Sequence, residues 1–148
     1  MHAELRAAIH SAKIEDKYTI APISIEDEAG LASYGINPSS VDTIVCIQCL
    51  CSCPNPKTLV RNIHKWLKPG GKLIIYEHVA SPDSITSKLQ YLWTELGWRR
   101  LFLGCEMTRP SGEWLEALGG WKEVKYGPLK GETRGMLYPH AAGLFVKQ

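Results

Sequence analysis

Two short apolar segments constrain the fold of this chain more than any other feature of its sequence. The first, Val41–Leu50, reads VDTIVCIQCL, and the second is Leu73–Tyr76. Runs of this kind, dominated by β-branched and other apolar residues, are typical of strands buried on both faces of a parallel sheet. We therefore expect two adjacent parallel strands, over 41–49 and 72–77.

The stretch between these segments carries the signals of a crossover helix. Asn55 is a favoured N-cap residue, and Pro56 occupies the first helical position, where proline is tolerated best. Apolar residues then recur at helical spacing as far as Leu67, and Pro69-Gly70-Gly71 ends the pattern. The sequence thus predicts a parallel strand–helix–strand unit with its helix over 55–68.

The remaining segments extend this unit into a larger α/β fold. Apolar spacing predicts helices over 2–13, 85–96 and 111–118. Strands are predicted over 18–25, 124–126 and 142–146. The chain has 148 residues, of which 45% are hydrophobic and 22% are charged, as expected for one globular domain over 1–148.

Charge and hydropathy exclude several classes of function. Seventeen Lys and Arg against 15 Asp and Glu give a net charge of +2, which is too small to suggest a nucleic acid as partner. The sequence contains no run of about 20 apolar residues that could span a membrane. The first ten residues lack the apolar core of a secretory signal, so a cytoplasmic location is expected.

Four of the five cysteines crowd together, at Cys46, Cys49, Cys51 and Cys53. Such a cluster does not resemble a disulfide framework, and its count of four suggests zinc. However, residues that alternate along a strand point to opposite faces, whereas the ligands of zinc must converge. We therefore predict no metal site, and a metal-binding module remains a third alternative for the function.

The segment Ser40–Val79 resembles the class I S-adenosylmethionine-dependent methyltransferases. The resemblance rests on the Asp early in the first strand, the sequence LKPGGKL and the acidic residue that ends the second strand. The later sequence LFLGCEMTRPSGEWLEALGGW and the approach Tyr138-Pro139-His140 resemble the thiol methyltransferase branch of that family. The resemblance implies a Rossmann-like sheet with strand order 3-2-1-4-5-7-6 and S-adenosylmethionine as cofactor.

The sequence departs from the family at its beginning. It contains no G-x-G-x-G turn, and no strand precedes the first predicted helix. Residues 1–6 resemble the family's segment just after strand two, so we expect a partial sheet that lacks the first two strands. Close backbone approach to a ligand needs glycine, so we expect this chain by itself to bind the cofactor weakly. An exposed sheet edge is also expected, through which copies of the chain could associate.

Two segments are candidate cofactor contacts by resemblance. Ser24, Ile25 and Glu26 lie where the family holds adenine, although they could simply form an acidic strand end that faces water. The second segment, Ile47, Gln48 and Cys49, lies where the chain passes beneath the cofactor. Its alternative role is plain sheet core, in which the polar Gln48 side chain would need a partner.

Two histidines are candidate proton acceptors, His78 at the end of a strand and His140 before the last one. Each could equally be a hydrogen-bonded structural histidine. Apolar residues of the helix around Trp93 and Trp98 form either the wall of a substrate pocket or core. The resemblance implies methyl transfer to a thiol, hydroxyl or amine of a small apolar molecule. The alternative is a non-catalytic methyltransferase-like remnant that serves as a binding or assembly partner.

Overall fold

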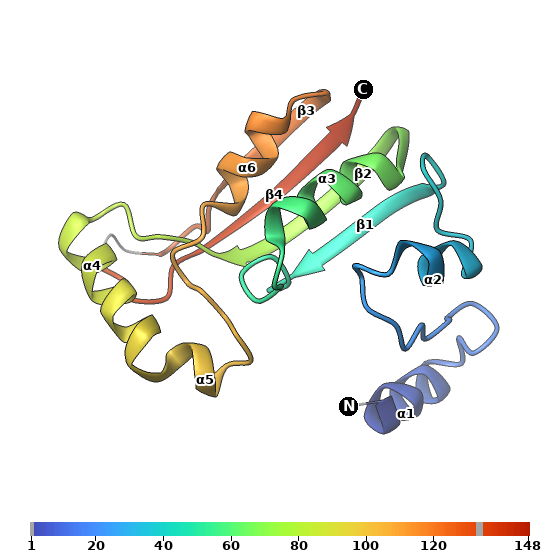
Figure 1. The fold of residues 1–148 in the computed structure, drawn as a ribbon, viewed down its shortest axis with the longest axis horizontal. Coiled ribbons are helices and arrows are strands. Elements are labelled where there is room, and N and C mark those ends of the chain that lie inside the picture. The colour runs from blue at the N-terminus through green and yellow to red at the C-terminus, as the bar shows by residue number, and fades with distance from the viewer. Residues whose placement is uncertain (1, 133–134) are drawn as a thin grey trace. The chain divides into compact units, whose positions relative to one another are not determined.

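The computed structural model describes residues 2–132 and 135–148. They fall into two compact units, Met1–Gly35 and Ile36–Gln148, which are described separately. Figure 1 shows the elements of both units.

The N-terminal unit contains two helices, α1 (His2–Ala12) and α2 (Glu28–Ser33). Asp27 caps α2, since its carboxylate accepts a hydrogen bond of 2.9 Å from the N–H of Gly30. The strand predicted over 18–25 is wrong, because this segment is irregular throughout. A strand needs a neighbour for its backbone groups, and the described residues of this unit provide none.

The second unit is built on a four-stranded sheet with the order β1-β2-β4-β3. Strands β1 (Val41–Ile47) and β2 (Leu67–His78) are parallel, and α3 (Pro56–Trp66) connects them. This confirms the strand–helix–strand unit and the α/β class. The sheet also follows the order of the last four strands that the family resemblance implied.

The last two strands are antiparallel to their neighbours. β4 (His140–Lys147) lies between β2 and β3 (Trp121–Pro128). Helices α3 and α6 (Ser111–Leu118) cover the same face of the sheet (Figure 1). Beneath them lies the core, in which Leu73, Ile75 and Phe145 are at most 1% exposed.

The opposite face of the sheet carries exposed apolar side chains. Val45 is 56% exposed, Ile47 is 63% exposed and Ile74, which pairs with Val45, is 44% exposed. The expectation that the first strand is buried on both faces is therefore wrong. Successive side chains of a strand alternate between the faces, and the two covering helices lie over only one of them.

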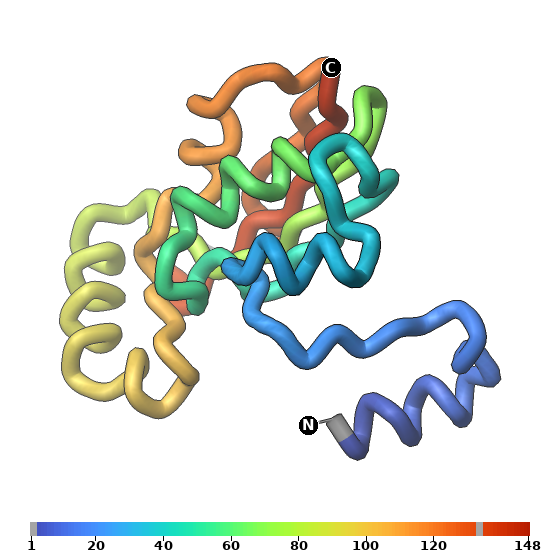
Figure 2. The backbone as a smooth tube through the Cα atoms, turned by 45° about the vertical axis from the view of Figure 1, so that its right-hand side comes forward, coloured from blue at the N-terminus to red at the C-terminus, as the bar shows by residue number. Residues whose placement is uncertain are grey.

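The chain between β2 and α6 forms a helical segment to one side of the sheet (Figures 1 and 2). It consists of α4 (Ser84–Trp93), the π-helix η1 (Thr94–Trp98) and α5 (Arg99–Leu101). Six residues of this segment line a cavity of about 300 Å³: Trp93, Leu96, Gly97, Trp98, Leu101 and Phe102. Across the described ranges, no helix has the length and apolarity needed to cross a membrane.

Candidate active site

The candidate site lies at the carboxyl ends of β1 and β2. Because these strands are parallel, both end at the same edge of the sheet, which is where open α/β sheets bind ligands. Strand β4 runs the other way and begins at this edge. As a result, His78, the last residue of β2, is directly opposite His140, the first residue of β4. Their ring centroids are 4.6 Å apart, so the structure brings the two candidate histidines together.

Glu77 fixes the loop that follows β1. Its side chain is fully buried, and its carboxylate accepts hydrogen bonds from three successive backbone N–H groups. The distances are 2.9 Å to Cys49, 3.0 Å to Leu50 and 3.1 Å to Cys51. These bonds replace the hydration that the carboxylate loses on burial, and they hold the loop against the end of β2.

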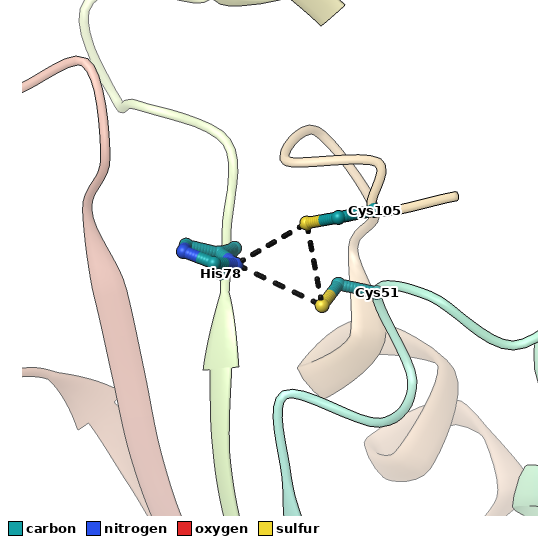
Figure 3. A group of neighbouring side chains, drawn as sticks. All are labelled: Cys51, His78 and Cys105. Atoms are coloured by element: carbon teal, nitrogen blue, oxygen red, sulfur yellow. Dashed lines mark hydrogen bonds between the residues drawn. The ribbon is translucent and has the colours of Figure 1, made fainter. Parts of the chain in front are cut away.

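A cluster of three buried side chains lies next to this loop (Figure 3). His78 Nδ1 is 3.4 Å from the Sγ of Cys105 and 3.7 Å from the Sγ of Cys51. The two sulfur atoms are 3.6 Å apart. Cys51 and Cys105 are 54 residues apart in sequence, so only the fold brings them together.

The pKa values of the two thiols in this cluster are shifted in opposite directions. The hydrogen bond with Cys51, assisted by His78, lowers the pKa of Cys105 to about 4. The same interaction with Cys105, together with burial, raises the pKa of the Cys51 thiol above its usual range. The interaction between the two sulfur atoms therefore lowers the pKa of one thiol and raises that of the other.

His140 is oriented by a carboxylate that the sequence did not reveal. Glu132 Oε1 lies 3.0 Å from His140 Nδ1, and Glu132 Oε2 accepts a 2.7 Å hydrogen bond from the backbone N–H of His140. On its other side the imidazole stacks on Tyr76, with 4.8 Å between the ring centroids. Glu132 lies in the polar connection before β4, and no spacing pattern distinguishes it from the other acidic residues.

The segment Ile47-Gln48-Cys49 leaves the sheet at this edge. All three residues are exposed, so the alternative of plain sheet core is wrong for this segment. Gln48 has a positive φ of 52°, which turns the chain out of β1, and its side-chain amide is 3.5 Å from His78 Nε2. A hydrogen bond from Cys46 lowers the pKa of the exposed Cys49 to about 7.

The other predicted cofactor contacts, Ser24, Ile25 and Glu26, belong to the N-terminal unit. They form an exposed turn in which Ser24 Oγ accepts a 3.2 Å hydrogen bond from the N–H of Glu26. The strand end on which their adenine role was based is absent, so that role stays a prediction.

The fold, with its ligand-binding edge at the carboxyl ends of β1 and β2, is that of the class I S-adenosylmethionine-dependent methyltransferases. Residues 6–118 match the family described as a methyltransferase domain, and the chain belongs to that family. S-adenosylmethionine is the cofactor of these enzymes.

The curated relatives include two human proteins. The thiol S-methyltransferase TMT1A is 33% identical over 126 residues, covering 80% of this chain and 49% of the relative. The thiol S-methyltransferase TMT1B is 31% identical over 136 residues, covering 89% of this chain and 51% of the relative. The chain therefore spans about half the length of these relatives.

Solved structures agree on the fold. An O-methyltransferase family protein from Burkholderia thailandensis has a TM-score of 0.63 at 16% identity, covering 99% of this chain and 40% of that one. A methyltransferase from Thermotoga maritima has a TM-score of 0.53 at 15% identity, covering 76% of this chain and 59% of that one. At these identities the likeness shows the fold alone.

One of the two predicted cofactor contacts is accessible at the edge of the sheet. The exposed turn at Ile47–Cys49 leaves the carboxyl edge of β1 accessible to a ligand, as a contact beneath the cofactor requires. The glycine-rich turn that would cradle the methionine end has no counterpart in the 148 residues.

Proposed function

We propose that this chain forms the acceptor-binding part of a methyltransferase that methylates the thiol of a small apolar molecule. The two human relatives named as thiol S-methyltransferases support a thiol as acceptor. The cavity beside Trp93 and Trp98 supports an apolar molecule, because most of its lining side chains are apolar.

The observation that carries the proposal is the pairing of His140 with Glu132. When bound, S-adenosylmethionine supplies a methyl group on a sulfonium that is already a good leaving group. The protein therefore needs only to align the acceptor and to remove its proton. Glu132 at Nδ1 holds a proton there, so Nε2 of His140 is the nitrogen that can accept one.

The strength of this base also favours a thiol. A thiol, whose ordinary pKa is about 8.5, is acidic enough to give its proton to a neutral imidazole at little cost. A hydroxyl group is a far weaker acid and would need a stronger base. His78, the second candidate, is less suited to this role because its Nδ1 faces two sulfur atoms.

An acceptor series tests the proposal directly. The chain is incubated with millimolar S-adenosylmethionine and with a thiol, an alcohol and an amine of the same aromatic skeleton, and methylated products are measured by mass spectrometry. We expect methylation of the thiol alone, with a lower rate for His140→Asn and a shifted pH profile for Glu132→Gln. Preference for the alcohol or the amine would contradict the proposal, as would an unchanged rate in both variants.

The chain offers a matched control pair. His10 Nδ1 and Glu15 Oε1 are 2.6 Å apart on the exposed surface of the N-terminal unit. His10→Asn and Glu15→Gln make the same chemical changes within the N-terminal unit, at residues with no predicted role in the site, and we expect both to keep the original rate and pH profile.

A second candidate function is that of a non-catalytic methyltransferase-like binding protein. The observation that favours it is the lack of a G-x-G-x-G turn in the sequence. The same assay distinguishes the two functions. Absence of product from every acceptor, together with retained binding of the apolar thiol, would support the second candidate and reject the first.

A further inference from the structure

We propose that Cys51, His78 and Cys105 bind a zinc ion as three corners of a tetrahedral site. These side chains are the cluster of Figure 3. Within the described ranges, no other group of three or more metal-ligating side chains converges in this way.

The distances within the cluster match those of zinc ligands. Zinc lies about 2.3 Å from sulfur and about 2.0–2.1 Å from nitrogen in tetrahedral sites. Tetrahedral angles then place two sulfur ligands about 3.8 Å apart and a sulfur and a nitrogen ligand about 3.5 Å apart. The structure has 3.6 Å between the sulfur atoms, and 3.4 and 3.7 Å from the sulfur atoms to Nδ1.

The ligands come from three parts of the chain that hydrogen bonds tie to one another. Cys51 lies in the loop after β1 that Glu77 fixes, and its carbonyl accepts a 2.8 Å hydrogen bond from the N–H of Glu106. His78 ends β2, and Cys105 is in the loop after α5. Arg109 also holds the loop that carries Cys51, because its Nη1 donates 2.7 Å hydrogen bonds to the carbonyls of Leu50 and Cys53.

His78 is oriented as a metal ligand usually is. Histidines that bind metals through one nitrogen generally donate a hydrogen bond from the other. The Gln48 amide nitrogen lies 3.5 Å from Nε2, and turning the amide by 180° would place its oxygen there to accept that bond once Nδ1 holds the metal. Gln48 is thus a positioning residue for the ligand.

The chemistry of the donors selects zinc. Two thiolates and one imidazole suit zinc, and the two negative charges balance the ion in a buried site. Burial is nearly complete, with Cys51 at 0%, Cys105 at 3% and His78 at 8% exposure. Met107, Trp98 and Tyr138 pack around the sulfur atoms and keep bulk water out. The fourth corner is left to a water molecule.

Zinc content and cobalt spectroscopy test the proposal. The protein is reduced, stripped of metal and titrated with Zn²⁺ or with Co²⁺, whose thiolate complexes absorb in the near ultraviolet. We expect one ion per chain. Cys105→Ser should weaken binding roughly 100-fold and remove one thiolate contribution from the cobalt spectrum. Gln48→Ala should weaken binding about 10- to 100-fold, as expected of a residue that orients a ligand.

Cys49→Ser is the matched control, since Cys49 is exposed and lies just two residues from Cys51. Equal loss of metal in Cys49→Ser and Cys105→Ser would overturn the proposal, as would the lack of 1:1 binding at micromolar Zn²⁺.

A test on the unmodified chain covers the case in which Cys105→Ser does not fold. In urea at a concentration at which local opening exposes the buried thiols, Zn²⁺ should slow the alkylation of Cys51 and Cys105 and leave Cys49 reactive. An unchanged alkylation rate of the first two would overturn the proposal. Neither readout depends on methyl transfer, so each can fail independently of the proposed activity.

Discussion

Glu77 and Cys51 are 26 residues apart, and the backbone N–H of Cys51 donates a 3.1 Å hydrogen bond to the Glu77 carboxylate. This bond joins the end of β2 to the loop after β1. It places one sulfur atom of the buried cluster beside His78, the residue that follows Glu77. The acidic strand end that supported the family resemblance therefore has a structural role in building the site.

Replacing Glu77 should destabilise the protein. The amide of Glu77→Gln presents an NH₂ group to backbone donors, so at least one buried N–H loses its acceptor. We expect a loss of about 1–3 kcal/mol in the free energy of unfolding, measured by urea denaturation. Glu113→Gln, an exposed change on α6, should have little effect. A difference below about 0.5 kcal/mol for Glu77→Gln would contradict this role.

Tyr126 should make the free energy of unfolding decrease at alkaline pH. Its ring packs so closely against Gly112 that a Cβ atom there would overlap it, and burial raises the pKa of the phenol from 10 to about 12. The folded state therefore favours the neutral phenol. This contribution is complete below pH 10 and is lost as the pH rises from 10 to about 12.

Tyr126→Phe should remove the loss of stability that ionisation of this phenol causes above pH 10. Urea unfolding between pH 9 and pH 12 should show a shallower decline for Tyr126→Phe than for the unmodified chain. Tyr18→Phe, in which the exposed Tyr18 is changed, should keep the original slope. Identical slopes for all three proteins would show that the phenol of Tyr126 is not held neutral by the fold.

The strand–helix–strand unit could be predicted from the sequence because its signals are local. Asn55 and Pro56 mark the start of a helix, and the apolar segments on either side are continuous. The strand predicted over 18–25 failed for the opposite reason. Its alternating residues indicate a strand only if another strand lies beside it, which a local pattern cannot establish.

The cluster of Cys51, His78 and Cys105 could not be predicted by the same reasoning. The sequence places four cysteines close together, but of these four only Cys51 belongs to the cluster. Its other members depend on where β2 ends and on how the loop after α5 returns. Glu132 likewise meets His140 through the turn before β4, and its sequence position alone does not mark it.

The chain by itself should bind S-adenosylmethionine with a dissociation constant weaker than about 10 μM, or about −7 kcal/mol. It supplies the Ile47–Cys49 edge but no glycine-rich turn for the methionine end. Isothermal titration calorimetry measures this affinity directly. Binding tighter than about 10 μM would show that other residues of the chain replace the missing turn.

Hydrogen exchange should separate the two units. In the N-terminal unit, Ile9 and Leu31 are the apolar side chains buried among the described residues, whereas α3 and β2 together bury a much larger set. We expect amides of residues 2–28 to exchange much faster than those of 55–77, measured by mass spectrometry on peptides. Equal and strong protection of both segments in a monomeric sample would contradict the expectation.

The open edge of β1 should make the protein associate with itself. Among the residues that the structure describes, β1 pairs with β2 alone, so its outer edge offers backbone groups to another chain. Its side chains do little to prevent this, because Val45 is 56% exposed and the Asp42 charge is paired with Lys68 at 2.8 Å.

A charge on this edge should oppose the association. Val45→Lys adds a cation to an exposed position of β1, and we expect it to raise the dimer dissociation constant at least tenfold, or about 1.4 kcal/mol, in sedimentation equilibrium. Ile85→Lys is the matched control, since Ile85 is 69% exposed on α4, outside the sheet. If both variants weaken association equally, the contact is non-specific and apolar. If the unmodified chain is monomeric at about 100 μM, the edge of β1 is not an interface between copies.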